Sequence, residues 1–278
     1  MAELSKIKRQ LSSIRSTQKL TNAMSLVSQA KLLQQRRRLQ ENTTYAQQYE
    51  IMLKTALSVP VEKETNPYLV ASKVNNPLHI VIASNSGLCG SYNSDLLKFV
   101  EQNVSREEPI FAIGNKAITY LMNNDFMVIK QFHDSDDLRP SVINKLISDV
   151  MTLYQNDEIS SIDIVYTKYI NSLKYEPVIK QILPFTGEYE VDPETDLSLE
   201  PNRDNILNNL IPSYVSAVIY EAILEAQTSE HAARRSAMDS ANNNAKDLIS
   251  SLEKTYNQIR QTAITQEVNE ITAGYDVS

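Results

Sequence analysis

The chain has 278 residues, of which 42% are hydrophobic, with five glycines, no tryptophan and a formal net charge of −7. This composition excludes collagen-like and low-complexity proteins and favours a folded protein with long helices. The single cysteine, Cys89, excludes an internal disulfide framework and a cysteine-cluster metal site, and it predicts a reducing compartment. No apolar run approaches the ~18 residues that cross a bilayer. We therefore expect an intracellular protein without direct membrane insertion.

The first segment, residues 1–59, contains neither glycine nor proline. It opens with apolar residues at steps of three and four, namely Leu4, Ile7, Leu11 and Ile14. This spacing predicts an amphipathic helix. The apolar stripe is expected to continue through Leu20, Met24 and Val27, with threonine and serine between them. Such a mixed stripe is typical of a helix that pairs over part of its length and is enclosed elsewhere by another protein.

The middle segment, residues 76–190, alternates short β-branched runs with helical patterns. The expected strands are Leu78–Ala83, Pro109–Ile113, Phe126–Lys130 and Ile162–Ile170, and the expected helices are Asn93–Val104, Asn115–Met122 and Pro140–Tyr154. This alternation predicts a Rossmann-like α/β domain, a mostly parallel sheet with helices on both faces. Tyr175–Leu183 carries Pro177 near its start and is expected to be an edge strand.

The last segment, residues 203–278, is expected to hold a short helix at Asp204–Leu210 and then a long helix that begins at Pro212. Residues at coiled-coil spacing follow, namely Ala241, Ala245, Leu248, Leu252, Tyr256 and Ile259. We expect this helix to pair with residues 1–59. The predicted fold is therefore a long antiparallel coiled coil of the two terminal helices, with an inserted Rossmann-like α/β domain.

Charge is unevenly distributed along the chain. The first forty residues hold nine of the 27 lysines and arginines but only one acid, Glu3. A basic helix on an acidic protein indicates an acidic partner, which is either nucleic acid or an acidic protein ring, unless the helix face is simply solvated. Few aromatic residues accompany Arg36, Arg37 and Arg38, and this disfavours a nucleic-acid-binding protein.

Few residues indicate catalytic or metal chemistry. The loop Ser84–Asn93 has Gly87 and Gly90 between a strand and a helix, where a phosphate would meet helix amides, but it matches no nucleotide fingerprint, and a tight structural turn is the alternative. An α/β enzyme built on this loop remains a further hypothesis. Neither a nucleophile–base pair for Cys89 nor a metal-ligand spacing is found, and we expect no cofactor and no metal. The three histidines, His79, His133 and His231, share no such spacing, and His231 is expected at the surface.

Three stretches resemble the gamma subunit of F-type ATP synthases, the central rotor shaft. They are IRSTQKLTNAMSLV at 14–27, SGLCGSYN at 86–93, and the pair SEHAARRSAM at 229–238 and YNQIRQTAITQEVNEI at 256–271. With the matching order of arms and body, the resemblance spans essentially the whole chain.

This resemblance implies a non-catalytic subunit that couples proton-driven rotation to conformational change in catalytic beta subunits. The implied partners are three alpha and three beta subunits, the epsilon subunit and the membrane c-ring, without nucleic acid. The implied location is the cytoplasmic face of the bacterial plasma membrane, with the mitochondrial matrix side as the alternative. By motif, Arg260, Gln261, Thr265 and Glu267 are expected to meet a beta-subunit loop, with Lys19 and Met24 near the same level of the facing helix.

Overall fold

The computed structural model describes residues 2–59, 66, 68–69, 72, 74–133, 140–185, 200 and 202–275. Two compact units make up the chain, Met1–Gln29 with Arg234–Ser278, and Ala30–Ala233. We call the first the terminal coiled coil and the second the body. Helices α1 (Ala2–Ser58) and α5 (Arg203–Tyr275) contribute residues to both units.

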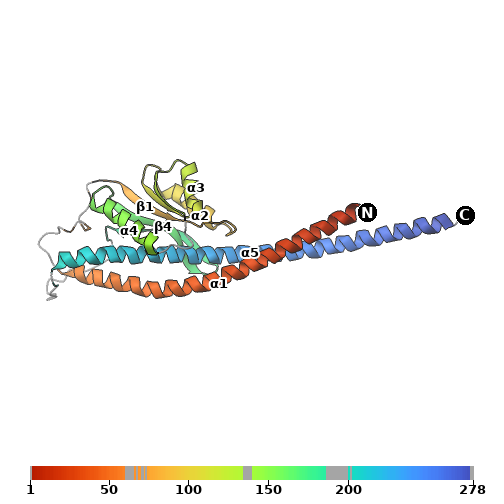
Figure 1. The fold of residues 1–278 in the computed structure, drawn as a ribbon, viewed down its shortest axis with the longest axis horizontal. Coiled ribbons are helices and arrows are strands. Elements are labelled where there is room, and N and C mark those ends of the chain that lie inside the picture. The colour runs from red at the N-terminus through yellow and green to blue at the C-terminus, as the bar shows by residue number, and fades with distance from the viewer. Residues whose placement is uncertain are drawn as a thin grey trace. The chain divides into compact units, whose positions relative to one another are not determined.

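A five-stranded sheet forms the centre of the body (Figure 1). Its strands are β1 (Pro77–Ile82), β2 (Ile110–Ile113), β3 (Val128–Phe132), β4 (Ser161–Asn171) and β5 (Lys174–Leu183). The strand order is β3-β2-β1-β4-β5, and all neighbours are parallel except β4 and β5. The predicted mostly parallel sheet and the edge position of the last strand are therefore confirmed.

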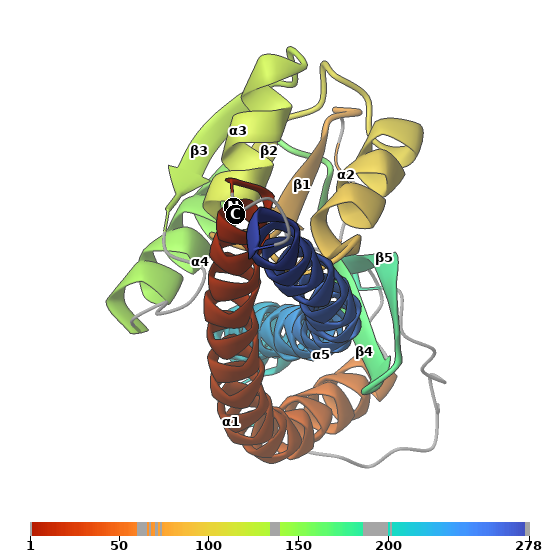
Figure 2. The same cartoon turned by 90° about the vertical axis from the view of Figure 1, so that its right-hand side faces the viewer.

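Helices cover both faces of this sheet, because its central strands bury side chains in both directions. On one face, α2 (Tyr92–Asn103) and α3 (Asn115–Asn123) pack on inward side chains such as Val81 and Ala112. On the other face, α4 (Pro140–Gln155) and the body portions of α1 and α5 share a larger core with residues such as Ile80 and Phe111. In Figure 2, α2 lies to the right of β1 and α4 lies to its lower left.

One glycine is required by the close packing of α3 on the first strand. Gly114 has a φ of +90°, and a Cβ added to it would lie 2.2 Å from the carbonyl oxygen of Ala83. The glycine therefore allows the turn after β2 to pass directly over the end of β1.

The N- and C-terminal helices run antiparallel to each other within each unit. In the body, the Nδ2 atom of Asn42 donates to the carbonyl of Ala217 at 3.3 Å, and the Nε atom of Arg203 donates to the carbonyl of Ala56 at 3.0 Å. In the terminal coiled coil, Arg15 pairs with Glu253 and Ser25 with Asp239. The sequence-based prediction of an antiparallel pair, which rested on two glycine-free arms, agrees with these contacts.

The start of the last helix differs from its prediction. Instead of a short helix followed by a break, α5 begins at Arg203 and contains Pro212 in its interior. The proline removes one backbone hydrogen bond, but burial of Ile211, Tyr214 and Val215 in the main core offsets that loss. Among the described residues, no helix is both long and apolar enough to cross a membrane.

Candidate functional site

The terminal coiled coil is held by a narrow seam of small and medium-sized side chains. Ile7, Leu11 and Ala245 are buried in it, and Leu4, Ile14, Ala241, Leu252 and Ile259 are half-buried. Alanines at seam positions let two helices approach closely, but each contributes little apolar burial. The seam therefore aligns the helices while supplying only modest stability.

One predicted seam residue faces solvent. Leu248 is 54% exposed, whereas its neighbour Ile249 is half-buried. The inward residues run Ala245, Ile249, Leu252 and Tyr256, a regular alternation of steps of four and three. Leu248 lies one residue before Ile249, about 100° away around the helix axis, and therefore falls outside this stripe. The assignment of Leu248 to the seam is therefore wrong.

In one stretch of α1 within the terminal coiled coil, which we call the inverted stretch, hydroxyl side chains face the partner helix and large apolar side chains face solvent. Thr21, Ser25 and Ser28 are buried against the partner helix. By contrast, Leu20 and Val27 are 60% and 58% exposed, and Leu26 is exposed as well. The expected continuation of the inward apolar stripe through Leu20 and Val27 is thus wrong. Exposed apolar side chains that gather on one face indicate an interaction surface, whereas singly scattered ones do not.

A hydrogen bond joins the neutral hydroxyl of Ser25 on α1 to the charged carboxylate of Asp239 on α5. The Oγ atom of Ser25 donates to Oδ1 of Asp239 at 2.5 Å, and Nε of Arg235 lies 3.7 Å from Oδ2 of the same carboxylate. A charge-assisted hydrogen bond at a buried serine sets which residues of the two helices stand opposite each other. No sequence pattern indicates this pairing, because serine and aspartate are common on solvated helix faces.

The residues that are predicted to meet a beta-subunit loop, and the two predicted near their level, lie on the terminal coiled coil. Lys19, Arg260, Gln261 and Thr265 are exposed, and Met24 is half-buried. The side chain of Glu267 lies outside the described residues. These exposed side chains are available to a partner, but their assignment as contacts stays a prediction.

The expected levels of these residues along the two helices are wrong. Ser25 pairs with Asp239 and Arg15 with Glu253, so Met24 stands near Asp239. Arg260 lies 21 residues further along α5, which is on the order of 30 Å at ~1.5 Å per residue. The predicted contacts on α1 and those on α5 therefore lie at two separate levels along the coiled coil. The Ser25–Asp239 hydrogen bond marks the register that places them apart.

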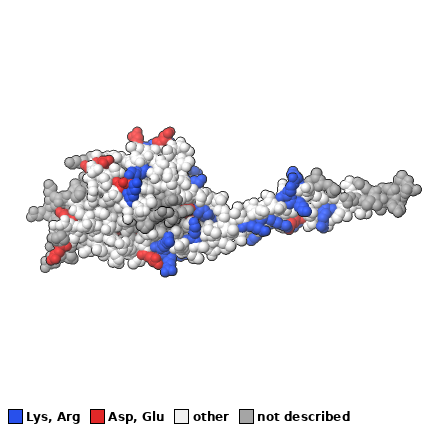
Figure 3. All heavy atoms as spheres, viewed as in Figure 1, with Lys and Arg blue, Asp and Glu red and all other residues white. Residues whose placement is uncertain are grey.

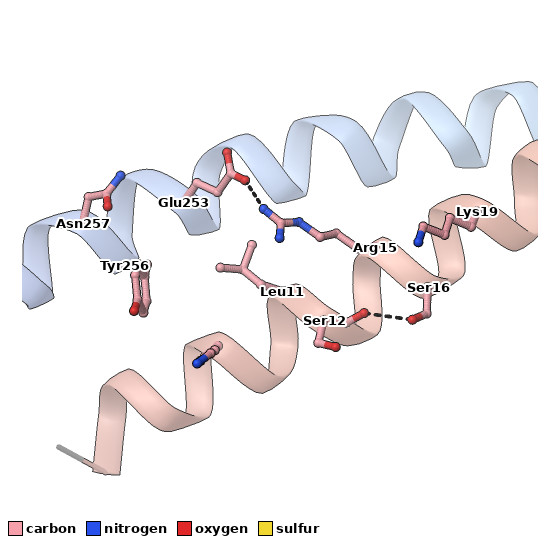
Figure 4. Close-up of a pocket in the computed structure, with 9 residues that line it drawn as sticks. Leu11, Ser12, Arg15, Ser16, Lys19, Glu253, Tyr256 and Asn257 are labelled. Atoms are coloured by element: carbon pink, nitrogen blue, oxygen red, sulfur yellow. Dashed lines mark hydrogen bonds and ion pairs between the residues drawn. The ribbon is translucent and has the colours of Figure 1, made fainter.

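Basic side chains gather along the outside of the terminal coiled coil, where Figure 3 shows lysines and arginines with few acids among them. Between its two helices lies a groove of about 630 Å³ (Figure 4). The groove is lined from α1 by Lys8, Leu11, Ser12, Arg15, Ser16 and Lys19, and from α5 by Glu253, Tyr256 and Asn257.

The body encloses α5 completely over a short stretch. Every residue from Ala226 to Ala233 is buried, so the helix has no solvent face there. Inside this stretch the Oγ atom of Ser229 donates to the carbonyl of Thr167 on β4 at 3.0 Å. His231 is buried rather than at the surface, which corrects its prediction. The physical reason is that strands and a loop cover the helix from several sides, which periodicity along the helix does not reveal.

The loop Ser84–Asn93 packs against the same stretch of α5. Cys89 and Tyr92 are buried with Ala233, and the Tyr92 hydroxyl donates to the carbonyl of Ala226 at 3.0 Å. Asn93 closes the loop by donating from Nδ2 to Ser84 Oγ at 2.8 Å. The loop interior is therefore filled by its own side chains, which favours the structural turn over a phosphate site and leaves Cys89 inaccessible as a nucleophile.

Two acidic side chains in the body are held in partly desolvated surroundings. Burial raises the pKa of Glu225, although Tyr166, which hydrogen-bonds to it, opposes the rise. Burial also raises the pKa of the Tyr166 hydroxyl, and Glu225 adds to that rise. Elsewhere, burial raises the pKa of Asp163 despite a hydrogen bond from Ser161 and the nearby His79. In the described part of the chain, no cluster of three or more His, Cys, Asp or Glu side chains suits a metal ion.

Comparisons with known proteins agree with the architecture. The family model described as ATP synthase matches residues 3–277. The ATP synthase gamma chain of Mycoplasma capricolum is 39% identical over 99% of this chain and 98% of its own length. That of Clostridium novyi is 35% identical, with 98% and 97% of the two chains covered.

Solved structures share the fold. A chain from the rotor of the Euglena gracilis mitochondrial ATP synthase matches with a TM-score of 0.68 at 16% identity, covering 95% of this chain and 99% of its own. A chain from the central stalk and c-ring structure of the Tetrahymena thermophila mitochondrial enzyme matches with a TM-score of 0.63 at 22% identity, covering 80% and 99%. The family model and the curated relatives cover almost the entire sequence. The chain therefore belongs to the family of ATP synthase gamma chains.

Proposed function

We propose that the chain is the central rotor subunit of an F-type ATP synthase, which couples proton-driven rotation to conformational change in catalytic beta subunits. Its proposed partners are three alpha and three beta subunits around the coiled coil, and the epsilon subunit and membrane c-ring at the body. The chain itself is proposed to be non-catalytic and peripheral to the membrane, on the cytoplasmic face in a bacterium.

The observation that carries this proposal is the inverted polarity of α1. Leu20, Leu26 and Val27 point away from the partner helix, while serine and threonine point toward it. This arrangement is costly in water, and it becomes favourable when an apolar wall surrounds the coiled coil. A surrounding ring of subunits supplies such a wall.

An asymmetric shaft inside a ring of equivalent sites has a direct mechanical consequence. The basic α1 and the more mixed α5 present different surfaces, so the surrounding subunits meet different contacts at any one angle. Rotation then shifts each catalytic site among its conformations through the difference in contact free energy between those conformations. The shaft needs no catalytic group for this role.

The loop Ser84–Asn93 supports the non-catalytic part of the proposal, since Cys89 and Tyr92 are buried in it and the Tyr92 hydroxyl is bonded to α5. The enclosed stretch of α5 supports the mechanical part. With Ser229 bonded to β4 and Tyr92 bonded to the helix backbone, the body grips α5 and torque on one is passed to the other.

Affinity purification of the full chain from its native cells tests the proposal. The expected result is recovery of two nucleotide-binding subunits, each in about threefold excess over the chain. The chain purified away from them is expected to hydrolyse no ATP. Hydrolysis by the purified chain, or recovery of the chain without such subunits, would count against the proposal.

A further inference from the structure

A second groove lies in the body, between α2 and α3. Its volume is about 320 Å³, at the lower end of the range for small-molecule pockets. No aspartate or glutamate is among the described residues that line it, and Lys116 is the one charged side chain among them. The groove is separate from the interior of the loop Ser84–Asn93, and only Asn85 of that loop contributes to its lining.

One end of this groove gathers hydrogen-bond donors. Oδ1 of Asn85 accepts from the backbone N–H of Asn115 at 3.2 Å, so the Asn85 carboxamide keeps its Nδ2 donors for a ligand. Oδ1 of Asn115 lies 3.1 Å from Nδ1 of His133, which likewise leaves the Asn115 Nδ2 donors available. The ammonium group of Lys116 pairs with no residue that the structure describes. Two carboxamide nitrogens beside an ammonium group suit an anion.

The other end of the groove has the opposite character. Nδ2 of Asn124 donates to the carbonyl of Tyr120 at 2.8 Å, so the Asn124 Oδ1 atom is left to accept. Nearby, burial raises the pKa of the Tyr120 hydroxyl, and a hydrogen bond to Glu101 on α2 adds to the rise. This end therefore accepts hydrogen bonds and repels an anion. It lies eight residues beyond Lys116, which is roughly 12 Å at ~1.5 Å per residue.

An apolar surface joins the two ends. Leu97 is buried in the groove, and the ring of Tyr120 is half-buried beside it. Aromatic side chains stack favourably on the flat rings of nucleobases. A free amino acid spans only about 3.6 Å of chain and cannot reach both ends. The lining therefore favours a longer molecule with an anion, a flat ring and a hydrogen-bond donor in that order.

We propose that the groove between α2 and α3 binds a nucleoside monophosphate, with its phosphate at Lys116 and its base over Leu97 and Tyr120. An amino group on the base then donates to Oδ1 of Asn124. The single lysine favours one phosphate over two or three, because further charge has no cation to meet. The binding is non-covalent, and it adds a small-molecule ligand to the role proposed above.

Titration of the full chain with adenosine monophosphate, followed by NMR, tests this inference. We expect saturable shifts of the backbone and side-chain amides of Asn85 and Asn115, with a dissociation constant below about 1 mM. Adenosine lacks the anionic group, and inorganic phosphate lacks the ring. Each is therefore expected to bind at least about tenfold more weakly.

Three variants separate a built site from general attraction to lysine. Lys116→Gln removes the ammonium group and is expected to raise the dissociation constant about tenfold. Asn85→Asp keeps an oxygen for the Asn115 amide but replaces the donors by a negative charge, so it should weaken binding at least as much. The control Lys145→Gln removes an exposed lysine from α4, on the other face of the sheet, and should leave binding unchanged. Lys116→Gln should melt at the wild-type temperature, because its side chain is exposed.

Several results would overturn the inference. Among them are the absence of saturable shifts, shifts confined to the terminal coiled coil, and wild-type affinity in Lys116→Gln. Binding of inorganic phosphate as tight as that of adenosine monophosphate would also overturn it, since the groove would then recognise an ion only. None of these results bears on the proposed function, which depends on recovery of the nucleotide-binding subunits.

Discussion

Replacing the outward apolar residues of the inverted stretch should weaken assembly without weakening the fold. Leu20 and Val27 are 60% and 58% exposed in the isolated chain. Full burial of such side chains is worth about 1.5–3 kcal/mol each, so burial of the exposed three-fifths by a ring would contribute roughly 1–2 kcal/mol per residue. The double variant Leu20→Gln/Val27→Gln should therefore lose about 2–4 kcal/mol of binding free energy at most. The measured loss should be smaller than this upper bound, because buried area converts incompletely into binding free energy.

The corresponding measurement is the dissociation constant of the full chain for the alpha–beta ring. At about 1.4 kcal/mol per tenfold, we expect the double variant to bind at least about tenfold more weakly. Thermal unfolding of the isolated variant should change little, because neither side chain belongs to the seam. Leu173→Gln is the matched control, since Leu173 is 88% exposed at the turn between β4 and β5. Unchanged binding of the double variant, or a large drop in its melting temperature, would refute the inference that Leu20 and Val27 face a partner rather than stabilise the isolated chain.

Three other changes have defined outcomes. Asp163→Asn should raise the free energy of unfolding at neutral pH. Burial raises the pKa of Asp163 in the folded state, so the wild type loses stability as the pH rises from the unfolded pKa of 3.8 through the folded pKa. In urea titrations, the stability difference between variant and wild type should therefore vanish at more acidic pH. Tyr92→Phe should lower the free energy of unfolding by about 1 kcal/mol through loss of the bond to Ala226; an unchanged denaturation midpoint would show that this bond does not hold the loop to α5. Arg260→Ala should leave the isolated chain equally stable, because the side chain is exposed, but should reduce ATP-driven proton pumping by the assembled complex; full pumping would remove Arg260 from the contact set.

The body was predictable from sequence because its elements bury their side chains in regular ways. The run Leu78–Ala83 differs by one residue at each end from β1, Pro77–Ile82. Pro177 correctly indicated an edge strand, since a proline interrupts pairing on only one side. Pro212, by contrast, led to the wrong prediction of a break between two helices. Tertiary packing around Ile211 and Tyr214 keeps α5 continuous through the proline.

The terminal coiled coil was predictable in outline but not in detail. Spacing alone assigned Leu20 and Val27 to the seam because apolar residues usually face a partner helix, and here the buried positions are Thr21, Ser25 and Ser28 instead. Under the proposed function, the information that decides between these faces lies in the surrounding subunits, which one sequence does not contain. The register is marked by two polar contacts, Ser25 with Asp239 and Arg15 with Glu253, for which no sequence pattern exists.

Direct observation of rotation tests the central claim. Cys89 is buried, so a cysteine introduced by Leu173→Cys at the exposed β4–β5 turn offers a selective attachment point for an optical probe. With the alpha–beta ring fixed to a surface and ATP supplied, the account predicts that the probe turns in one direction in steps of a third of a revolution. A probe that stays fixed, or that only fluctuates about one angle while the ring hydrolyses ATP, would contradict it.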